Sequence, residues 1–395
     1  MSSPRKRGPR FAGLLGSRVR GNDKVGKTLP SQRTLLARKL RERIERYGPM
    51  TVADWMEACL ADPEHGYYMT RDPFGRRGDF ITSPEISQMF GELLGLWSAV
   101  VWQQMGQPDQ IHLIELGPGR GTLMSDALRA AGGVPAFIEA VHVHMVETSP
   151  VLRERQQNAL RNIGVSIDWH DAIETIPKGP SIVLANEFLD ALPVRQLIRH
   201  GGAWCERMVG LSDDRFSFEV GAPVEEGGVP DNLTDAPDGS IFEVSPAVRD
   251  VTRDLASRLV DDGGAALLID YGHDRSGLGE TLQALEGHEY ADPLSSPGEC
   301  DLTAHVDFAA AATHAEKAGA RAWGPIEQGD LLERLGIGAR AAQLLQGADT
   351  KQAEQIGTAR HRLTGAAAMG RLFRALALTD PGRAAPPGFE TVSPF

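Results

Sequence analysis

Cysteine is scarce in this chain of 395 residues, and the three that are present lie far apart. Cys59, Cys205 and Cys300 form no CxxC pair and no Cys/His cluster, so neither a disulfide framework nor a zinc site is indicated. This usage fits a reducing compartment. Long apolar runs are also missing, since even residues 265–269 are only of strand length, far below the roughly 20 residues that span a bilayer. We therefore expect no membrane span.

Several catalytic motifs are absent as well. The sequence has no GxSxG nucleophile elbow and no Walker loop, which leaves hydrolase and phosphoryl-transfer functions without support. The histidines show no metal-ligand spacing: His142 and His144 alternate on one predicted strand, while His170, His273 and His305 are isolated. We interpret all of them as structural and expect no metal.

Positive charge is concentrated at the start of the chain. Residues 1–30 carry eight Lys or Arg against one acid, a charge of about +7, which leaves about −19 for the rest when the total is −12. Such an acidic body repels nucleic acid and tolerates a basic partner. We interpret residues 1–30 as a disordered basic tail or a mis-assigned start, with an organellar transit peptide as the alternative. The expected compartment is the bacterial cytoplasm, or the mitochondrial matrix under that alternative.

Hydrophobic spacing indicates a helical N-terminal region. Residues 34–47 place their apolar side chains on one stripe, and Thr51 can cap a second helix. A long loop rich in Gly, Pro and Asp follows, and an apolar helix is predicted over 86–104. Together these segments form a predicted helical and lid region over residues 31–109.

From about residue 110, β-rich runs alternate with helical ones. This alternation predicts an α/β fold of the Rossmann-like type, with a mostly parallel twisted sheet and helices on both faces. The rhythm breaks after Asp190, where hairpin patterns and a Pro/Gly-rich loop predict an antiparallel insertion over 195–244. It resumes with a helix over 245–260 and the strand AALLIDYG. The predicted core domain is therefore 110–395, with a C-terminal elaboration.

The stretch IHLIELGPGRGT reads as a strand, a glycine-rich turn and a helix start. Gly117, Gly119 and Gly121 would leave backbone amides facing a ligand beyond the carboxyl end of the first strand, although glycines also occur in ordinary turns. A dinucleotide fingerprint would need a third glycine where Thr122 stands. The observed spacing, with Glu115 just before the loop, instead resembles the S-adenosylmethionine motif of class I methyltransferases.

Acids also follow the next two predicted strands. Glu147 stands where Rossmann-like folds accept hydrogen bonds from ribose hydroxyls, and a solvated charge is the alternative. Asp171 can accept from an adenine amino group, or it can cap the helix that follows. We predict that both residues contact the cofactor.

The fourth strand leads into Asn186, Glu187 and Asp190. In class I methyltransferases, whose cofactor motif the glycine-rich turn resembles, this position faces the methyl group that is transferred. Two carboxylates three residues apart can grip a guanidinium by charge-assisted hydrogen bonds and take up a proton. The alternative is a helix start that Asn186 caps, with the acids favouring the helix dipole. We predict catalytic roles for these three residues.

Several blocks of this sequence resemble the MidA-like methyltransferase family. The resemblance runs from about Gly48 to Phe389 and is carried by MTVADWMEACLADPEHGYYM, GDFITSPEISQMFGELLG, IELGPGRGTLMSDALR, LANEFLDALP and YADPLSSPGECDLTAHVDF. It implies a class I methyltransferase core that uses S-adenosylmethionine and releases S-adenosylhomocysteine. The family's mitochondrial member methylates an arginine of a respiratory complex I subunit, so the resemblance implies a protein substrate and arginine methylation.

The resemblance also implies a lid over the methionine end of the cofactor, formed by Gly78, Asp79, Phe80, Ser83 and Glu85. Two alternatives to catalysis on protein arginine stay open. One is a cofactor-binding assembly chaperone without catalysis, and the more distant one is an NAD(P)-dependent oxidoreductase. The oligomeric state is also open, with a homodimer as one arrangement.

Overall fold

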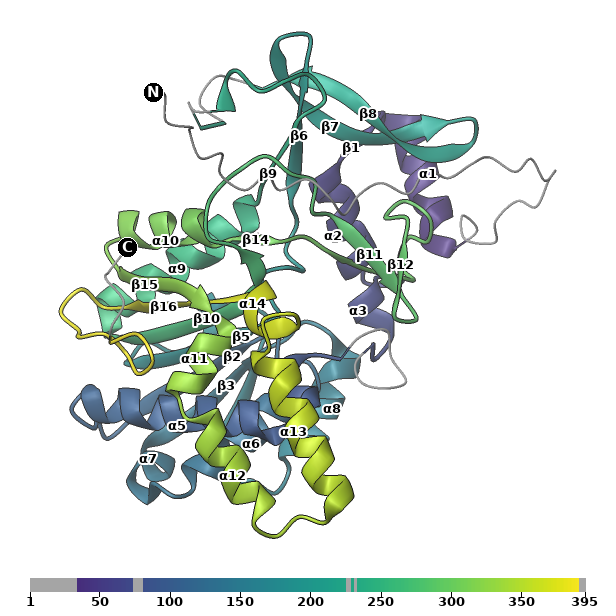
Figure 1. Cartoon of the computed structure of the whole chain (residues 1–395). Coiled ribbons are helices and arrows are strands. Elements are labelled where there is room, and N and C mark those ends of the chain that lie inside the picture. The colour runs from purple at the N-terminus through teal and green to yellow at the C-terminus, as the bar shows by residue number, and fades with distance from the viewer. Residues whose placement is uncertain (1–33, 74–80, 225–228, 231–232, 391–395) are drawn as a thin grey trace, which may run out of the picture. The chain divides into compact units, whose positions relative to one another are not determined.

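The central sheet has eight strands in this computed structural model, which describes residues 34–73, 81–224, 229–230 and 233–390 (Figure 1). The strand order is β15-β16-β10-β5-β2-β3-β4, and β14 also pairs with β10. β4, β3, β2, β5 and β10 are parallel, whereas β16 is antiparallel to both β10 and β15. The predicted α/β fold with a mostly parallel sheet is confirmed. The bounds are β2 Ile111–Leu116, β3 Val141–Val146, β4 Ile167–His170, β5 Ser181–Asn186, β10 Gly264–His273, β14 Val306–Asp307, β15 Arg321–Glu327 and β16 Phe373–Thr379.

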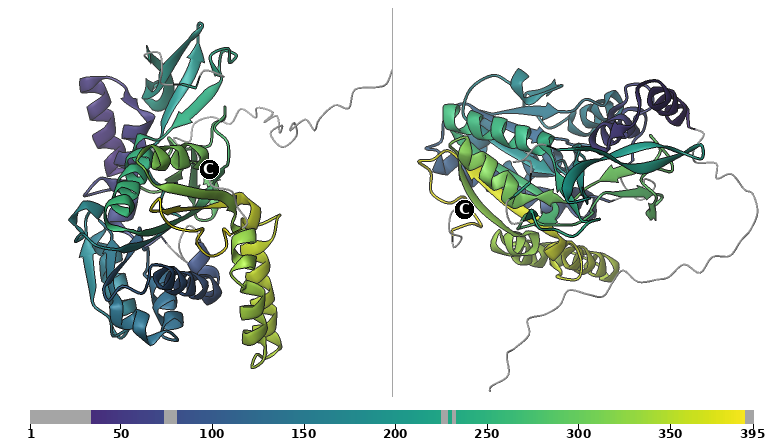
Figure 2. Two further views of the ribbon diagram at one scale, coloured as in Figure 1. Left: turned by 90° about the vertical axis from the view of Figure 1, so that its left-hand side faces the viewer. Right: turned by 90° about the horizontal axis from the view of Figure 1, so that it is seen from above.

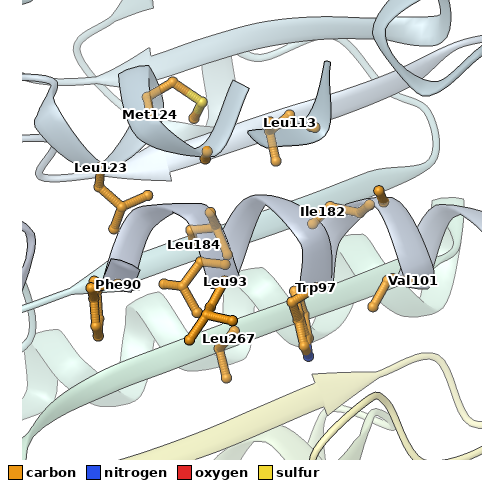
Figure 3. Close-up of a cluster of buried hydrophobic side chains, with 14 of the residues drawn as sticks. Phe90, Leu93, Trp97, Val101, Leu113, Leu123, Met124, Ile182, Leu184 and Leu267 are labelled. Atoms are coloured by element: carbon orange, nitrogen blue, oxygen red, sulfur yellow. The ribbon is translucent and has the colours of Figure 1, made fainter. Parts of the chain in front are cut away.

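Helices cover one face of this sheet with a large apolar core. Figure 3 shows α5 turning Phe90, Leu93 and Trp97 toward the sheet, where they meet buried strand residues such as Leu184 and Leu267. Burial of side chains of this size stabilises the fold by about 1.5–3 kcal/mol each. The helices that contribute to this core include α5 Gln88–Gln104, α6 Thr122–Ala131, α7 Pro135–Ala140 and α8 Pro150–Leu160.

Two further helices, α9 Pro246–Asp262 and α10 Phe308–Lys317, cover the opposite face (Figure 1). Their buried residues pack against alternate strand positions, such as Ile114 and Val183. Because both faces are covered there, β5 and most of β10 are buried and apolar on both sides, as parallel strands usually are. The ends of the strands are then left uncovered by helices, and a ligand can bind there.

The N-terminal region pairs with the antiparallel insertion. Thr51 caps α2 through a capping box with Asp54, so the predicted cap is confirmed. The short β1 pairs with β7, and α1 lies beside the β7–β8 hairpin (Figures 1 and 2). The predicted hairpins of the insertion form a five-stranded antiparallel sheet. The bounds are α1 Leu35–Tyr47, β1 Met50–Thr51, α2 Val52–Ala61, α3 Tyr67–Thr70, α4 Ser83–Ile86, β6 Arg195–His200, β7 Ala203–Ser212, β8 Arg215–Pro223 and β9 Ile241–Val244.

The C-terminal part adds elements that the sequence patterns did not resolve. A small antiparallel sheet has the order β12-β11-β13. Four helices lie between β15 and β16 in the sequence. Across the ranges that the structure describes, no helix has the length and apolarity to cross a membrane. The bounds are β11 Gln283–Glu286, β12 Glu289–Ala291, β13 Asp301–Thr303, α11 Gln328–Arg334, α12 Ile337–Leu345, α13 Thr350–Thr364 and α14 Met369–Leu372.

Candidate active site

The glycine-rich loop joins β2 to α6 at the carboxyl edge of the sheet. Gly117, Gly119 and Gly121 have φ values of 60°, 52° and 79°, a region that side chains other than glycine enter at a cost. A Cβ on Gly117 would lie 2.7 Å from Cδ2 of Phe188. The loop therefore needs glycine for its conformation, and at Gly117 also for space.

A small cavity of about 30 Å³ beside this loop contains unsatisfied polar groups. Glu115, Asn186 and Glu187 line it together with the loop. Oε2 of Glu115 and Oδ1 of Asn186 are buried, and neither has a hydrogen-bond partner among the described residues. Buried acceptors of this kind are costly unless a donor reaches them. The α-ammonium group of an S-adenosylmethionine would satisfy both, so the residues present fit the methionine end of that cofactor.

Glu147 lies directly after β3 and is held in place by its neighbours. Its Oε1 accepts a hydrogen bond from the Ser149 amide at 2.8 Å, and its Oε2 accepts one from Nε2 of Gln156 at 3.2 Å. The same Gln156 nitrogen donates to the Gly119 carbonyl at 2.8 Å. Burial raises the pKa of Glu147. The residue lines a cavity beyond the sheet, where its contact with the ribose hydroxyls stays a prediction.

Asp171 does not cap a helix, so that alternative is wrong. The short 3-10 helix that follows covers Ile173–Thr175, begins after Ala172 and has no side-chain cap. Asp171 is exposed instead, and its Oδ1 pairs with Nη2 of Arg153 at 2.6 Å. It lines the same cavity as Glu147, where the adenine role stays a prediction.

The lid residues fall partly within the described chain. Gly78, Asp79 and Phe80 lie outside the described residues. Ser83 is fully buried, and its amide donates to Oε1 of Glu187 at 2.7 Å. Oε1 of Glu85 accepts from the Thr122 hydroxyl at 2.5 Å, which brings the lid and the start of α6 together.

The turn after β5 differs from the helix start that was considered as an alternative. No helix begins at Asn186, and Glu187 has a φ of 51°. Oδ2 of Asp270, on β10, instead accepts hydrogen bonds from the amides of Phe188, Leu189 and Asp190 at 2.9–3.1 Å. The helix-cap explanation is therefore wrong. A side chain of the neighbouring strand β10 stabilises the turn, so neither Glu187 nor Asp190 serves as a helix cap.

A second cavity, of about 790 Å³, extends from the loop across the strand ends. Gly117, Gly119 and Glu187 line both cavities, so the two meet at the exit of β5. Glu147 and Asp171 line one part of the larger cavity. Its volume is in the range of ordinary ligand sites.

Two acids and two tyrosines line another part of the larger cavity, whose lining also includes aliphatic side chains and Arg362. Asp190 and Asp301 line it, together with Tyr68 and Tyr271. The Tyr68 hydroxyl donates to Oδ1 of Asp301 at 2.8 Å, and Tyr271 hydrogen-bonds to Asp190. We name Glu187, Asp190, Asp301, Tyr68 and Tyr271 the acidic pocket.

Burial sets the electrostatics of the acidic pocket. It raises the pKa of Glu187 to about 7, with a further contribution from Asp190. It likewise raises the pKa of Asp190 to about 6, and it lifts the pKa of Asp270 well above its usual value. A cation placed among these groups would favour their ionised forms. The pocket is therefore suited to a positively charged ligand.

The sequence patterns did not predict roles for Tyr68, Tyr271, Asp301, Asp270 or Gln156. Asp270 and Tyr271 follow the apolar run of β10, so the end of a fifth parallel strand was a usable indication. Asp301 and Tyr68 lie in segments whose partners are more than 230 positions away, and no local pattern links them. Gln156 looks like any polar residue of a helix.

Comparisons with known proteins agree with this geometry. Residues 93–326 match a protein-family profile described as "Putative S-adenosyl-L-methionine-dependent methyltransferase". The mitochondrial protein arginine methyltransferase NDUFAF7 homolog of Drosophila melanogaster is 39% identical over 373 residues, which cover 87% of this chain and 84% of the relative. The mitochondrial protein arginine methyltransferase NDUFAF7 of Mus musculus is 35% identical over 353 residues, or 82% of this chain and 79% of the relative.

A solved structure is also similar over most of its length. It is the crystal structure of a superfamily member from Burkholderia thailandensis bound to S-adenosyl-homocysteine. The TM-score is 0.78 at 28% sequence identity, and the match covers 90% of this chain and 94% of that one. With the family profile and the curated relatives, this likeness shows that the chain belongs to the family of S-adenosyl-L-methionine-dependent methyltransferases.

Proposed function

We propose that this enzyme methylates an arginine side chain of a protein substrate, and that the acidic pocket holds the target guanidinium. The observation that carries the proposal is that three carboxylates, those of Glu187, Asp190 and Asp301, line the same cavity as the glycine loop. A guanidinium is planar, permanently charged and rich in donors. Carboxylates are the matching acceptors.

Glu187 is the residue that we assign to the reacting nitrogen. It lines both cavities, so it lies between the predicted methionine end and the other residues of the acidic pocket. The Ser83 amide and the Asn186 side chain donate to its Oε1 at 2.7 and 3.1 Å. These bonds fix the carboxylate, which is the condition for holding a nucleophile in line.

The chemistry needs a proton acceptor as well as a holder. The bound cofactor supplies the methyl group and leaves as S-adenosylhomocysteine. An arginine is a weak nucleophile because its pKa lies above 12, so a proton must leave the guanidinium as the new N–C bond forms. Glu187 takes up that proton, since burial already raises its pKa to about 7. Asp190 and Asp301 hold the charged guanidinium in place.

The rim of the larger cavity supports a polypeptide substrate. Tyr290 and Leu372 line this cavity, yet their side chains are 79% and 50% exposed. Exposed apolar side chains that line the cavity can pack against the chain that carries the arginine. The names of the curated relatives support protein arginine as the target. We further propose a respiratory complex I subunit as the substrate, on the family resemblance described above.

A transfer assay tests this function. The purified enzyme is incubated with methyl-labelled cofactor and an extract from cells that lack the enzyme. The labelled proteins are first separated and then hydrolysed to amino acids. We expect label in methylarginine and in a discrete protein band. Glu187→Gln should abolish the label, whereas the control Glu139→Gln, on the exposed side of α7, should not. Label on another amino acid would contradict the arginine assignment, and cofactor binding without transfer would indicate an assembly chaperone.

We also propose that the enzyme works in a reducing compartment, either the cytoplasm or the mitochondrial matrix. Cys59, Cys205 and Cys300 are buried and free. Burial raises the pKa of the Cys59 thiol and lowers its reactivity. Fractionation of the host cell tests this location.

A further inference from the structure

A group of histidines lies on one face of the central sheet, outside the cavities described above. His142 and His144 alternate on β3, so they share a face. The parallel register places His112 of β2 beside His142, and Asp168 of β4 beside His144. His170 lies two residues beyond Asp168 and shares its face. The sequence spacing gave no indication of this group because the members come from three strands.

Three of these imidazoles form a hydrogen-bonded row. Nδ1 of His112 lies 2.8 Å from Nε2 of His144, and Nδ1 of His144 lies 2.9 Å from Nε2 of His170. Nδ1 of His170 continues to the hydroxyl of Thr175 at 2.9 Å. A row of this kind satisfies buried rings by itself, so it explains these histidines without any ligand.

His142 and Asp168 are not explained by this row. The His142 ring stacks on His144 with centroids 4.5 Å apart, and its Nε2 lies 2.9 Å from Oδ2 of Asp168. Within the described part of the chain, that nitrogen has no partner with hydrogen-bond geometry. One ligand atom from each of His142, His144 and Asp168 lies within 4.8 Å of the other two. Ligands of a tetrahedral ion lie about 3.3 Å apart when the bonds are 2.0–2.1 Å long.

The charges nearby favour this end of the group for a cation. The positive charge of Arg258 acts on His112, where Asp262 opposes it, and the positive charges of Arg153 and Arg258 act on His170, where Asp168 opposes them. The charged group that acts on His144, apart from the other imidazoles, is the Asp168 carboxylate. The side chains of His142 and Asp168 are 41% and 61% exposed, which gives an ion a path from solvent.

We propose that His142, His144 and Asp168 bind a divalent transition-metal ion, with Zn²⁺ as the best match. Two imidazoles and one carboxylate are borderline ligands that suit Zn²⁺ better than Mg²⁺ or Ca²⁺, which prefer oxygen. His144 exchanges one of its contacts in the row for the metal, and water fills the remaining position. The ion joins β3 to β4, the four-residue strand at the edge of the sheet.

The test uses the full chain without a histidine tag, freed of metal by a chelator and titrated with Zn²⁺ in a calorimeter. We expect one ion per chain, a melting temperature that rises with Zn²⁺, and visible absorption of four-coordinate Co²⁺ when that ion replaces it. His142→Ala and Asp168→Asn should each weaken binding by more than about tenfold. Both positions are partly exposed, so these variants should still fold. His200→Ala removes an exposed histidine of β6 and should bind like the wild type.

Three results would overturn the proposal. They are equal affinity in the His142 and Asp168 variants, a stoichiometry well below one, and loss of binding in His200→Ala alone. The proposal is independent of the methyl transfer. His142→Ala should therefore retain the cofactor affinity of the wild type, as measured in the same calorimeter.

Discussion

The backbone amide of Ser83 donates a hydrogen bond of 2.7 Å to Oε1 of Glu187, across 104 positions of sequence. Ser83 begins α4, and Glu187 follows β5 with a φ of 51°. A non-glycine residue in this left-handed region is uncommon and persists where its surroundings hold it. Here the contact from α4 and the Asn186 side chain hold the carboxylate at the junction of the two cavities.

Replacing Glu187 with Gln should remove the negative charge of the side chain and keep its shape. We expect turnover to fall by about 10²- to 10⁴-fold, as for a positioned acid or base, with cofactor affinity close to normal. Single-turnover kinetics and calorimetry measure the two quantities. If Glu187→Gln and Asp190→Asn both methylate normally, the lid acids Asp79 and Glu85 become the better candidates.

Asp270 should contribute stability through the turn that carries the acids. Its Oδ2 accepts from three amides, and its Oδ1 accepts from the Tyr271 amide at 2.9 Å. Asp270→Asn retains one acceptor oxygen for the three amides and should cost about 1–2 kcal/mol. Asp270→Ala leaves all four amides unsatisfied and should cost more, on the order of 3 kcal/mol or above. Chemical denaturation tests this order, and equal losses in the two variants would contradict it.

The sequence predicted the α/β core well because most of its parallel strands are short, largely apolar runs, and an acid stands near the end of several of them. Glu115 and Glu147 are such residues: Glu115 lines the smaller cavity and Glu147 the larger one, and their contacts with the cofactor stay predictions. The sequence could not show that Asp270 caps the turn after β5, since the two strands are about 80 positions apart and the same letters suit a helix start. Asp301 is also distant in sequence from its partners, so only the folded structure shows that it belongs to the site.

Gly117→Ala should weaken cofactor binding through a steric conflict. An alanine at a φ of 60° carries a backbone cost of about 1–2 kcal/mol, and its Cβ would also meet the Phe188 ring at 2.7 Å. Gly164→Ala is the matched control, because Gly164 has a φ of 80° and nothing within 4 Å of a Cβ.

Both alanine variants should melt earlier, but only Gly117→Ala should raise the cofactor Kd, by about tenfold or more, equal to 1.4 kcal/mol. Gly119→Val should abolish binding for the related reason that its side chain would enter the cofactor space. An unchanged Kd in Gly117→Ala would show that the Phe188 ring can move away.

Gln156 should support the cofactor site without touching the reaction. It is fully buried, donates to both Gly119 and Glu147, and accepts from Nε1 of Trp169 at 2.9 Å. Gln156→Leu leaves these partners unsatisfied and should cost about 1–3 kcal/mol of stability, with weaker cofactor binding. Gln157→Leu, on the exposed side of the same helix, is the control. A Gln156→Leu variant with full cofactor affinity would contradict the positioning role.

The stability of the ligand-free protein should depend on pH through Glu187. Burial raises the pKa of its side chain from 4.5 to about 7, and that of Asp190 from 3.8 to about 6. The folded state therefore holds these protons more tightly than the unfolded chain. Their contribution to stability is complete below about pH 4 and is lost as the pH rises through about 7.

A comparison of wild type with Glu187→Gln isolates this effect. The pKa values of Asp62 and Glu92 are lowered, which gives the opposite pH trend, but both proteins share these residues and the trend cancels in the difference. We expect the wild type to lose unfolding free energy relative to Glu187→Gln between about pH 4.5 and 7. Methyl transfer should rise over the upper part of that range, since the carboxylate is the form that accepts the proton. A difference in unfolding free energy that stays flat with pH would show that Glu187 is already ionised in the fold.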